Sequence, residues 1–234
     1  MNVLAVVCHP DDMELNCGGT LLRCKKRGDN VTVCHVANGN MGHLVIMPDE
    51  LREIRAQESQ DAGAVGGFKI VTCDVDDLTI CRADTEQHDR LVKIIREAKP
   101  DFIITHGPDD YMIDHTDVSK LTFAASFSAS CPHYKPELGD ATPVTPIYYM
   151  ENFQSVGTIP TEYVDITDEI DDKLAMLACH KSQSVWLKDH DNVDILEDTR
   201  AYARFRGMQC HAKYAEGFRQ CIVGERMVTR RLLP

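Results

Sequence analysis

Two clusters of acidic and histidine residues contain side chains of the kinds that bind metal ions. The first, His9-Pro10-Asp11-Asp12, directly follows the apolar run Asn2–Cys8. The second, His106–His115, follows the apolar run Asp101–Thr105 and contains three aspartates between its terminal histidines. Catalytic zinc is held by three imidazole or carboxylate ligands, with a further position open for water. Both clusters offer ligands of this type.

One cation could be shared between the clusters. His9 and Asp12 are three residues apart across an expected strand-to-helix turn, so both can reach one ion, and His115 can supply the third ligand from a neighbouring strand. Asp11 then remains free to take a proton from the zinc-activated water as it attacks a carbonyl carbon. Taken singly, an aspartate that opens a helix is commonly an N-cap, and His115 could begin or cap a helix without binding anything. The occurrence of both clusters favours the metal site.

Strands and helices must alternate for the clusters to meet. Short β-branched runs predict strands, and longer stretches with helical spacing, ended by glycine or proline, predict helices. This alternation predicts an α/β fold with a doubly wound, mostly parallel sheet and helices on both faces. Ligands bind such sheets beyond the carboxyl ends of the strands. The expected strands are 2–8, 31–36, 68–73 and 101–105, and the expected helices are 12–27, 48–65, 85–98 and 117–130.

The last third of the chain has a weaker pattern. Residues 131–145 contain three prolines and a glycine and are expected to form a surface loop. Strands are expected at 146–150 and 162–166, a helix from Thr167 to about Ser182, and an exposed polar stretch at 188–198. We expect a single domain over residues 1–234, with an irregular C-terminal third from about residue 131.

Composition narrows the range of partners. The formal net charge of −12 disfavours nucleic acid and anionic lipid surfaces and suits a small polar substrate. No run approaches the roughly 20 apolar residues that a membrane span needs, so membrane insertion is not expected. The N-terminus lacks the basic region of a signal peptide, which predicts a cytoplasmic protein. Ten scattered cysteines without a C-x-x-C pair are expected to be reduced thiols rather than disulfides or zinc ligands.

The first cluster belongs to a longer pattern. His9-Pro10-Asp11-Asp12-x-Glu14, followed by Cys17-Gly18-Gly19-Thr20-Leu21, resembles the signature of the LmbE/PIG-L family of zinc-dependent N-deacetylases. Weaker matches follow in the family's order: Ile54-Arg55-x-x-Glu58, Asp110-Tyr111-x-x-Asp114-His115, Asp165–Asp168, Lys173-Leu174, His180–Gln183 and Lys213–Phe218. The resemblance implies a Rossmann-like fold and removal of an acetyl group from an N-acetylglucosamine-type substrate. It also implies that zinc is held by His9, Asp12 and His115.

The resemblance assigns further roles and exposes one departure. It implies that Asp11 is the general base and that Arg55 reaches the amino-sugar substrate. The family usually has His-Pro-Asp-His where this chain has Met112-Ile113-Asp114-His115, so Met112 replaces a histidine that polarises the carbonyl or protonates the departing amine. The catalytic residue Asp114 would then lack its usual partner. Tyr111 and His106 are expected substrate contacts and, with His43, are candidates to replace the missing acid, as is Asp11 itself.

Other interpretations remain open. The same metal site could cleave an ester or phosphoester, or Met112 could mark a non-catalytic sugar-binding relative. Dinucleotide binding is disfavoured because Gly18-Gly19 lies too far into the expected helix to form a G-x-G-x-x-G turn. A site with two histidines and one aspartate also accepts Fe²⁺ or another divalent ion in place of zinc. Relatives commonly assemble, so the resemblance further implies a homo-oligomer.

Overall fold

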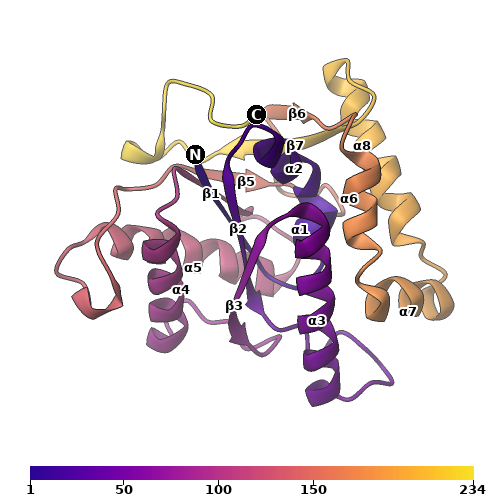
Figure 1. Ribbon diagram of the computed structural model, residues 1–234, viewed down its shortest axis with the longest axis horizontal. Helices are drawn as coiled ribbons and strands as arrows, with labels where there is room; N and C mark the ends of the chain where they lie inside the picture. The colour runs from indigo at the N-terminus through magenta and orange to yellow at the C-terminus, as the bar shows by residue number, and fades with distance from the viewer.

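A seven-stranded sheet organises the protein in the computed structural model, which describes residues 1–234. Its strand order is β3-β2-β1-β4-β5-β7-β6 (Figure 1). All pairs from β3 to β5 are parallel, whereas β7 is antiparallel to both of its neighbours. The strands are β1 (Asn2–Val7), β2 (Asn30–Ala37), β3 (Lys69–Val75), β4 (Phe102–His106), β5 (Ile147–Met150), β6 (Glu162–Asp165) and β7 (Ala215–Gln220).

Helices cover both faces of this sheet, which confirms the predicted fold class. On one face α4 (Thr85–Ala98) and α5 (Ile113–Ser130) pack against inward-facing residues such as Leu4 and Val6 of β1. On the other face lie α1 (Asp12–Asn16), α2 (Gly18–Lys26), α3 (Pro48–Gly66), α6 (Ile170–Leu177) and α8 (Ile195–Cys210) (Figure 1). Because both faces are covered, β1 is buried along nearly all of its length, as its continuous apolar sequence predicts.

The order of the strands places the two clusters side by side. Strand β1 pairs with β2 on one side and with β4 on the other, so the chain winds in opposite directions from β1. The loops after β1 and β4 therefore leave the same edge of the sheet at a topological switch point, where ligands bind in folds of this kind. His9 and His115 follow these two strands.

Two predicted helices differ from the structure near the site. The helix expected at 12–27 is divided at Cys17 into α1 and α2, because the Glu216 carboxylate accepts the backbone N–H groups of Gly19 and Thr20 and so caps a new helix start. Helix α5 begins at Ile113 rather than near residue 117. His115 therefore lies in the first turn of α5.

The C-terminal third is more regular than expected. Helix α7 (Lys181–Asp191), α8 and β7 occupy stretches that were expected to be irregular or exposed, and the helix expected at 167–182 is the shorter α6 followed by a break before α7. Strand β7 inserts between β5 and β6, so these residues complete the same sheet. Two short 3₁₀ turns, Pro136–Leu138 and Gly224–Arg226, lie in connecting loops. None of the helices combines the length and apolar composition needed to cross a bilayer.

Candidate metal centre and active site

His9, Asp12 and His115 converge at the carboxyl edge of the sheet. Asp12 Oδ2 lies 3.4 Å from His9 Nδ1 and 3.3 Å from His115 Nε2. Ligand atoms about 2.0–2.1 Å from a tetrahedral zinc ion are roughly 3.3 Å apart, so these separations match a shared ion. His115 Nε2 is buried without a hydrogen-bond partner, which fits a lone pair held for a cation. The three side chains fit a divalent metal.

The charges around His9, Asp12 and His115 also suit a cation. Burial alone would lower the pKa of His115, but Asp12 and Asp110 outweigh it and raise the pKa to about 9. Burial alone would raise the pKa of Asp12, but His115 and His106 hold it well below its usual range. Asp12 is thus a buried carboxylate that is ionised at neutral pH, and a metal ion could replace the protons that its histidine neighbours hold.

A second carboxylate orients each of the two candidate histidine ligands. His9 Nε2 lies 3.3 Å from Asp114 Oδ2, and His115 Nδ1 lies 3.2 Å from Asp110 Oδ2. Metal-binding histidines usually bond through their second nitrogen to such a group, which fixes the ring and strengthens the ligand. Asp114, expected to lack a partner because of Met112, thus contacts His9 instead. The supporting role of Asp110 was not predicted from the sequence.

Cys8 also lies within the cluster, with its sulfur 3.6 Å from His9 Nε2. The residue is fully buried, and burial raises the pKa of its thiol to about 12. A thiol in this state is a weak ligand, because metals bind the thiolate. We therefore assign Cys8 to packing behind the candidate ligands, since it does not line the cavity that opens above them.

Asp11 points away from its neighbour Asp12. Its φ of 117° lies in a region that aspartate enters more readily than most residues, and its side chain makes no N-cap bond. The simple N-cap interpretation therefore fails for Asp11. Its Oδ2 instead lies 3.1 Å from Arg55 Nη2. Burial raises the pKa of Asp11, and Arg55 opposes that effect, which leaves the pKa at about 6.

Arg55 is positioned to hold Asp11. The side chain extends from α3, is 3% exposed, and donates to the backbone carbonyls of Pro10 and Gly39 as well as to Asp11. Although Arg55 lines the cavity, its guanidinium is largely engaged by the protein. These contacts give Arg55 a structural role, and its contact with the substrate stays a prediction.

A cavity of about 460 Å³ opens above these residues. Tyr111 and Met112 both line it, as do the metal-site residues and Asp114. His106 and His43 do not. His106 lies 1% exposed behind His115, with ring centroids 4.0 Å apart, and its Nε2 accepts the N–H of Cys8. His106 is thus buried under a candidate ligand and does not line the cavity, and its contact with the substrate stays a prediction.

His43 is also outside the cavity. Its Nδ1 accepts the backbone N–H groups of Val45 and Ile46, and its ring lies 5.2 Å from that of Trp186. Of the four candidates to replace the missing acid, Tyr111 and Asp11 therefore line the cavity, whereas His106 and His43 do not. Burial raises the pKa of Tyr111, so its phenol keeps its proton at neutral pH.

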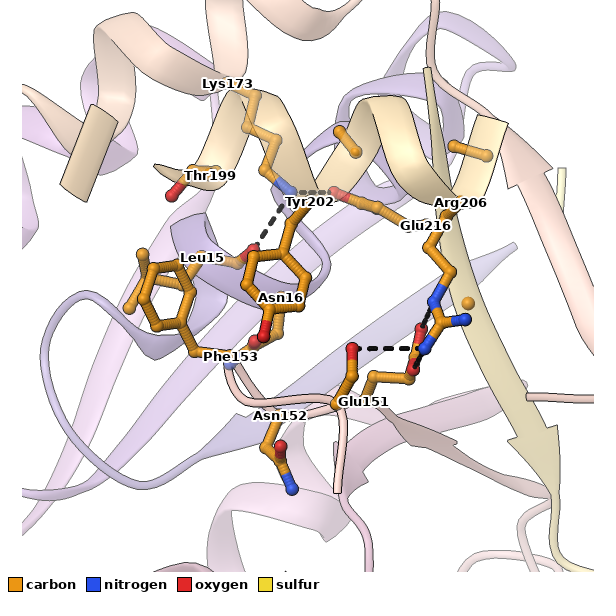
Figure 2. A pocket seen from close by; sticks show the side chains of 14 residues that line it. Leu15, Asn16, Glu151, Asn152, Phe153, Lys173, Thr199, Tyr202, Arg206 and Glu216 are labelled. Atoms are coloured by element: carbon orange, nitrogen blue, oxygen red, sulfur yellow. Dashed lines mark hydrogen bonds and ion pairs between the residues drawn. The ribbon is translucent and has the colours of Figure 1, made fainter. Parts of the chain in front are cut away.

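A smaller cavity of about 30 Å³ lies behind α1 and shares Leu15 and Asn16 with the larger one. Figure 2 shows the Lys173 ammonium between the Leu15 carbonyl and Glu216, at 3.0 Å and 2.6 Å. Because Glu216 also caps α2, this buried pair joins α6 and β7 to the two helices that follow the first cluster. Glu216 therefore supports the two helices that follow the first cluster.

A second ion pair in the smaller cavity holds the loop after β5. Arg206 Nε lies 2.7 Å from Glu151 Oε2, and a further guanidinium nitrogen contacts the other carboxylate oxygen (Figure 2). The rings of Phe153 and Tyr202 pack beside this pair, with centroids 5.1 Å apart. These contacts fix Phe153 where it lines both cavities.

Another buried pair joins α1 to the break between α6 and α7. His180 Nε2 is 3.1 Å from Glu14 Oε1, and neither residue is measurably exposed. Burial alone would lower the pKa of His180, but Glu14 and Asp11 raise it overall. His180 comes from the break between α6 and α7, so sequence spacing could not have placed it beside the first cluster. The carboxylates of Glu14 and Asp11 thus favour the protonated form of the His180 ring.

The family model described as PIG-L, GlcNAc-PI de-N-acetylase, matches residues 4–126, which are more than half of the chain. The chain belongs to this family. All three candidate metal ligands, Asp11 and Arg55 lie in the matched segment, so the family resemblance inferred from the sequence is confirmed.

Individual relatives include enzymes with two chemistries. The chain is 29% identical to 1D-myo-inositol 2-acetamido-2-deoxy-alpha-D-glucopyranoside deacetylase 2 of Saccharopolyspora erythraea, over 80% of this chain and 85% of that protein. It is 25% identical to 4-oxalmesaconate hydratase of Pseudomonas putida, over 78% and 74% of the two chains. Its fold is similar to that of N,N'-diacetylchitobiose deacetylase from Pyrococcus horikoshii, with a TM-score of 0.79, 24% identity, and coverage of 94% and 84%.

Proposed function

We infer that this PIG-L family protein is a metal-dependent hydrolase that removes the acetyl group from an N-acetylglucosamine-type substrate. The observation that carries this proposal is the convergence of His9, Asp12 and His115 on one point, with Asp11 beside them and turned to a different partner. A curated deacetylase of an acetamido sugar among the relatives supports it. Two histidines and one carboxylate favour zinc, although such a site also accepts Fe²⁺.

The residues of the site divide the chemistry between them. A divalent ion held by His9, Asp12 and His115 would supply a Lewis acid that polarises the amide carbonyl and lowers the pKa of water. With its pKa at about 6, the Asp11 carboxylate is mostly ionised at neutral pH and can accept the proton of the attacking water. Arg55 keeps that carboxylate in place. Either Asp11 or Tyr111 can then return a proton to the departing amine.

Acetate release from N-acetylglucosamine derivatives tests the proposal. We expect the purified protein with zinc to release acetate and to lose this activity when a chelator removes the metal. Asp11→Asn should lower kcat by about 10²–10⁴-fold, the range expected for loss of a positioned base, with the metal content unchanged. Full activity in Asp11→Asn, or turnover that survives complete metal removal, would contradict the assignment.

Tyr111→Phe separates the two routes for the second proton. If the phenol protonates the amine, kcat should fall in this variant while metal content stays the same, and if Asp11 carries the proton through both steps, kcat should be nearly unchanged. The half-buried Tyr163 lies on β6, outside the cavity. Tyr163→Phe is therefore the matched control for loss of a phenol.

Hydration of an unsaturated acid is the second candidate, since one relative carries the name of a hydratase. Met112 favours it, because adding water to a double bond does not require protonation of a departing amine. The cavity argues against a strongly anionic substrate: Arg55 is its single arginine or lysine side chain, and Asp11 and two backbone carbonyls engage it. Loss of absorbance on incubation with an unsaturated dicarboxylate, without acetate release from any amide, would establish the hydratase instead.

A further inference from the structure

The active-site cavity has a polar floor and an apolar side. The floor is the candidate metal centre with Asp11. The side is formed by Phe153, Leu187, Val193 and Ile195, which come from the loop after β5, from α7, from the α7–α8 connection and from the start of α8. We call these four residues the apolar wall. At about 460 Å³, the cavity is larger than an acetamido group needs, so it has room for a further part of the substrate.

Several polar groups that line the cavity outside the metal centre are already bonded to the protein. Asp77 accepts two backbone N–H groups of the loop after β2, at 2.8 and 3.0 Å. The amide nitrogen of Gln183 donates to a carbonyl of the same loop at 3.2 Å, and that of Asn16 donates to a carbonyl in α1 at 3.0 Å. The Arg55 guanidinium donates to two backbone carbonyls and to Asp11. The Tyr111 phenol and the amide oxygens of Gln183 and Asn16 are left to bind hydroxyls of the substrate, and a buried hydroxyl beyond their reach would be costly.

Large apolar side chains also stand exposed at the rim of the cavity. Leu78 is 79% exposed and Met41 is 50% exposed, and both line it. Covering this surface with an apolar group would be favourable, at roughly 25 cal/mol for each Å² removed from water.

The apolar wall and the residues proposed for chemistry lie in different parts of the sequence. The family model matches residues 4–126, and all four wall residues lie beyond that segment. The residues proposed for chemistry lie within it.

We propose that the substrate is an amino sugar with an apolar aglycone, alkyl or aryl, which lies against the apolar wall while its acetamido group occupies the metal centre. This proposal rests on the deacetylase function inferred above. It assigns substrate selection to α7 and to the connection that follows it.

Two N-acetylglucosaminides that differ only in aglycone test this inference. We expect kcat/KM for acetate release to be at least about tenfold higher for the 4-nitrophenyl glycoside than for the methyl glycoside, because a few apolar carbons in a fitting pocket are worth this much. Leu187→Asn should bring the ratio of kcat/KM between the aryl and the methyl glycoside close to one. Val193→Asn should act in the same direction and serves as a second variant if one of the two is unstable.

Val185→Asn is the matched control. Val185 lies in the same helix as Leu187, is 56% exposed, and does not line the cavity. We expect it to leave both glycosides unaffected. A loss of the aryl advantage in this variant would attribute the effect to α7 as a whole and overturn the role of the wall.

The outcomes separate this inference from the proposed function. Equal kcat/KM for the two glycosides, with acetate released from both, would overturn the apolar-aglycone proposal and leave deacetylation intact. If neither glycoside releases acetate, the proposed function fails, and calorimetry then measures their binding to the same zinc-loaded protein. Tighter binding of the aryl glycoside that Leu187→Asn abolishes would still support the wall, and equal or undetectable binding would overturn it.

Discussion

Replacing Asp114 with asparagine should weaken metal binding without removing a ligand. Asp114 is 4% exposed, and its Oδ2 accepts the N–H of Leu78 at 2.8 Å and lies 3.3 Å from His9 Nε2. Asparagine keeps the size of the side chain and an acceptor for Leu78, but it removes the charge that orients the His9 ring. Loss of such an outer contact typically costs 10–100-fold in metal affinity, which is about 1.4–2.7 kcal/mol.

Competition between the protein and a chromophoric chelator for Zn²⁺ measures this effect directly. The control is Asp109→Asn, which removes a nearby carboxylate whose side chain is 62% exposed and pairs with Arg219 at the surface. We expect the control to bind zinc as the unmodified protein does. Circular dichroism spectra should be the same for all three proteins, because neither change creates a cavity.

An unchanged zinc affinity in Asp114→Asn would refute the reasoning. If kcat at saturating zinc fell in the same variant, Asp114 would act on the substrate or on a proton in transfer, as the family resemblance implies. A fall in affinity with kcat recovered at high zinc would instead assign Asp114 to orientation of His9. Measuring kcat of this variant as zinc is added therefore distinguishes a role of Asp114 in catalysis from a role in orienting His9.

Three further predictions follow from particular contacts. Met112→His should raise kcat for acetate release, because it restores an acid at a position that lines the cavity; a lower kcat would mean that the chain has adapted to methionine. Lys173→Met should lower the free energy of unfolding in urea by about 3 kcal/mol, since it leaves the Glu216 carboxylate buried without its ammonium partner, whereas Lys93→Met, at an exposed pair, should have no measurable effect. Burial lowers the pKa of His35 to about 4, so the unfolded chain binds a proton at this residue first as pH falls below about 6.5. The titration of His35 should therefore contribute a loss of about 3 kcal/mol to the free energy of unfolding between pH 6.5 and 4. His35→Gln should show a smaller pH dependence in the same urea titrations, and equal slopes would contradict this prediction.

The parallel part of the fold could be predicted because each element carries its own local signal. Strands β1 and β4 are short apolar runs, and helix α4 is bounded as predicted at Thr85 and Ala98. The rule that parallel strands end at one edge of the sheet then brings His9 and His115 together without further information. Local pattern and one topological rule were sufficient for the candidate ligand set.

The C-terminal elements lack such signals. Strand β7 has the sequence AEGFRQ, without a β-branched residue, and its position between β5 and β6 depends on partners far away in the chain. Helix α8 has helical spacing at its buried positions, but threonine, alanine, arginine and glycine occupy most of them. A pattern read from large apolar residues cannot detect a face of this composition.

The buried ion pairs that support the site could not be predicted from the sequence for a different reason. Lys173–Glu216 and Glu14–His180 join residues that are 43 and 166 positions apart, and each pair is visible only when the fold places it. The residue types indicated only that each charged side chain would need a partner if it were buried, since buried charges are almost always paired. Without the fold, the partner of each charge could not be chosen among the other charged residues.

Adjacent carboxylates at positions 11 and 12 can serve two partners because the backbone turns between them. The φ of 117° at Asp11 directs its side chain to Arg55, while Asp12 faces His9 and His115. Such a conformation costs on the order of 1–3 kcal/mol and persists only where the surroundings enforce it. Arg55 does so by contacting the Pro10 carbonyl and the Asp11 carboxylate together. A bound metal would therefore leave Asp11 available as a base, since the same arginine that fixes the turn also holds its carboxylate away from the ligand set.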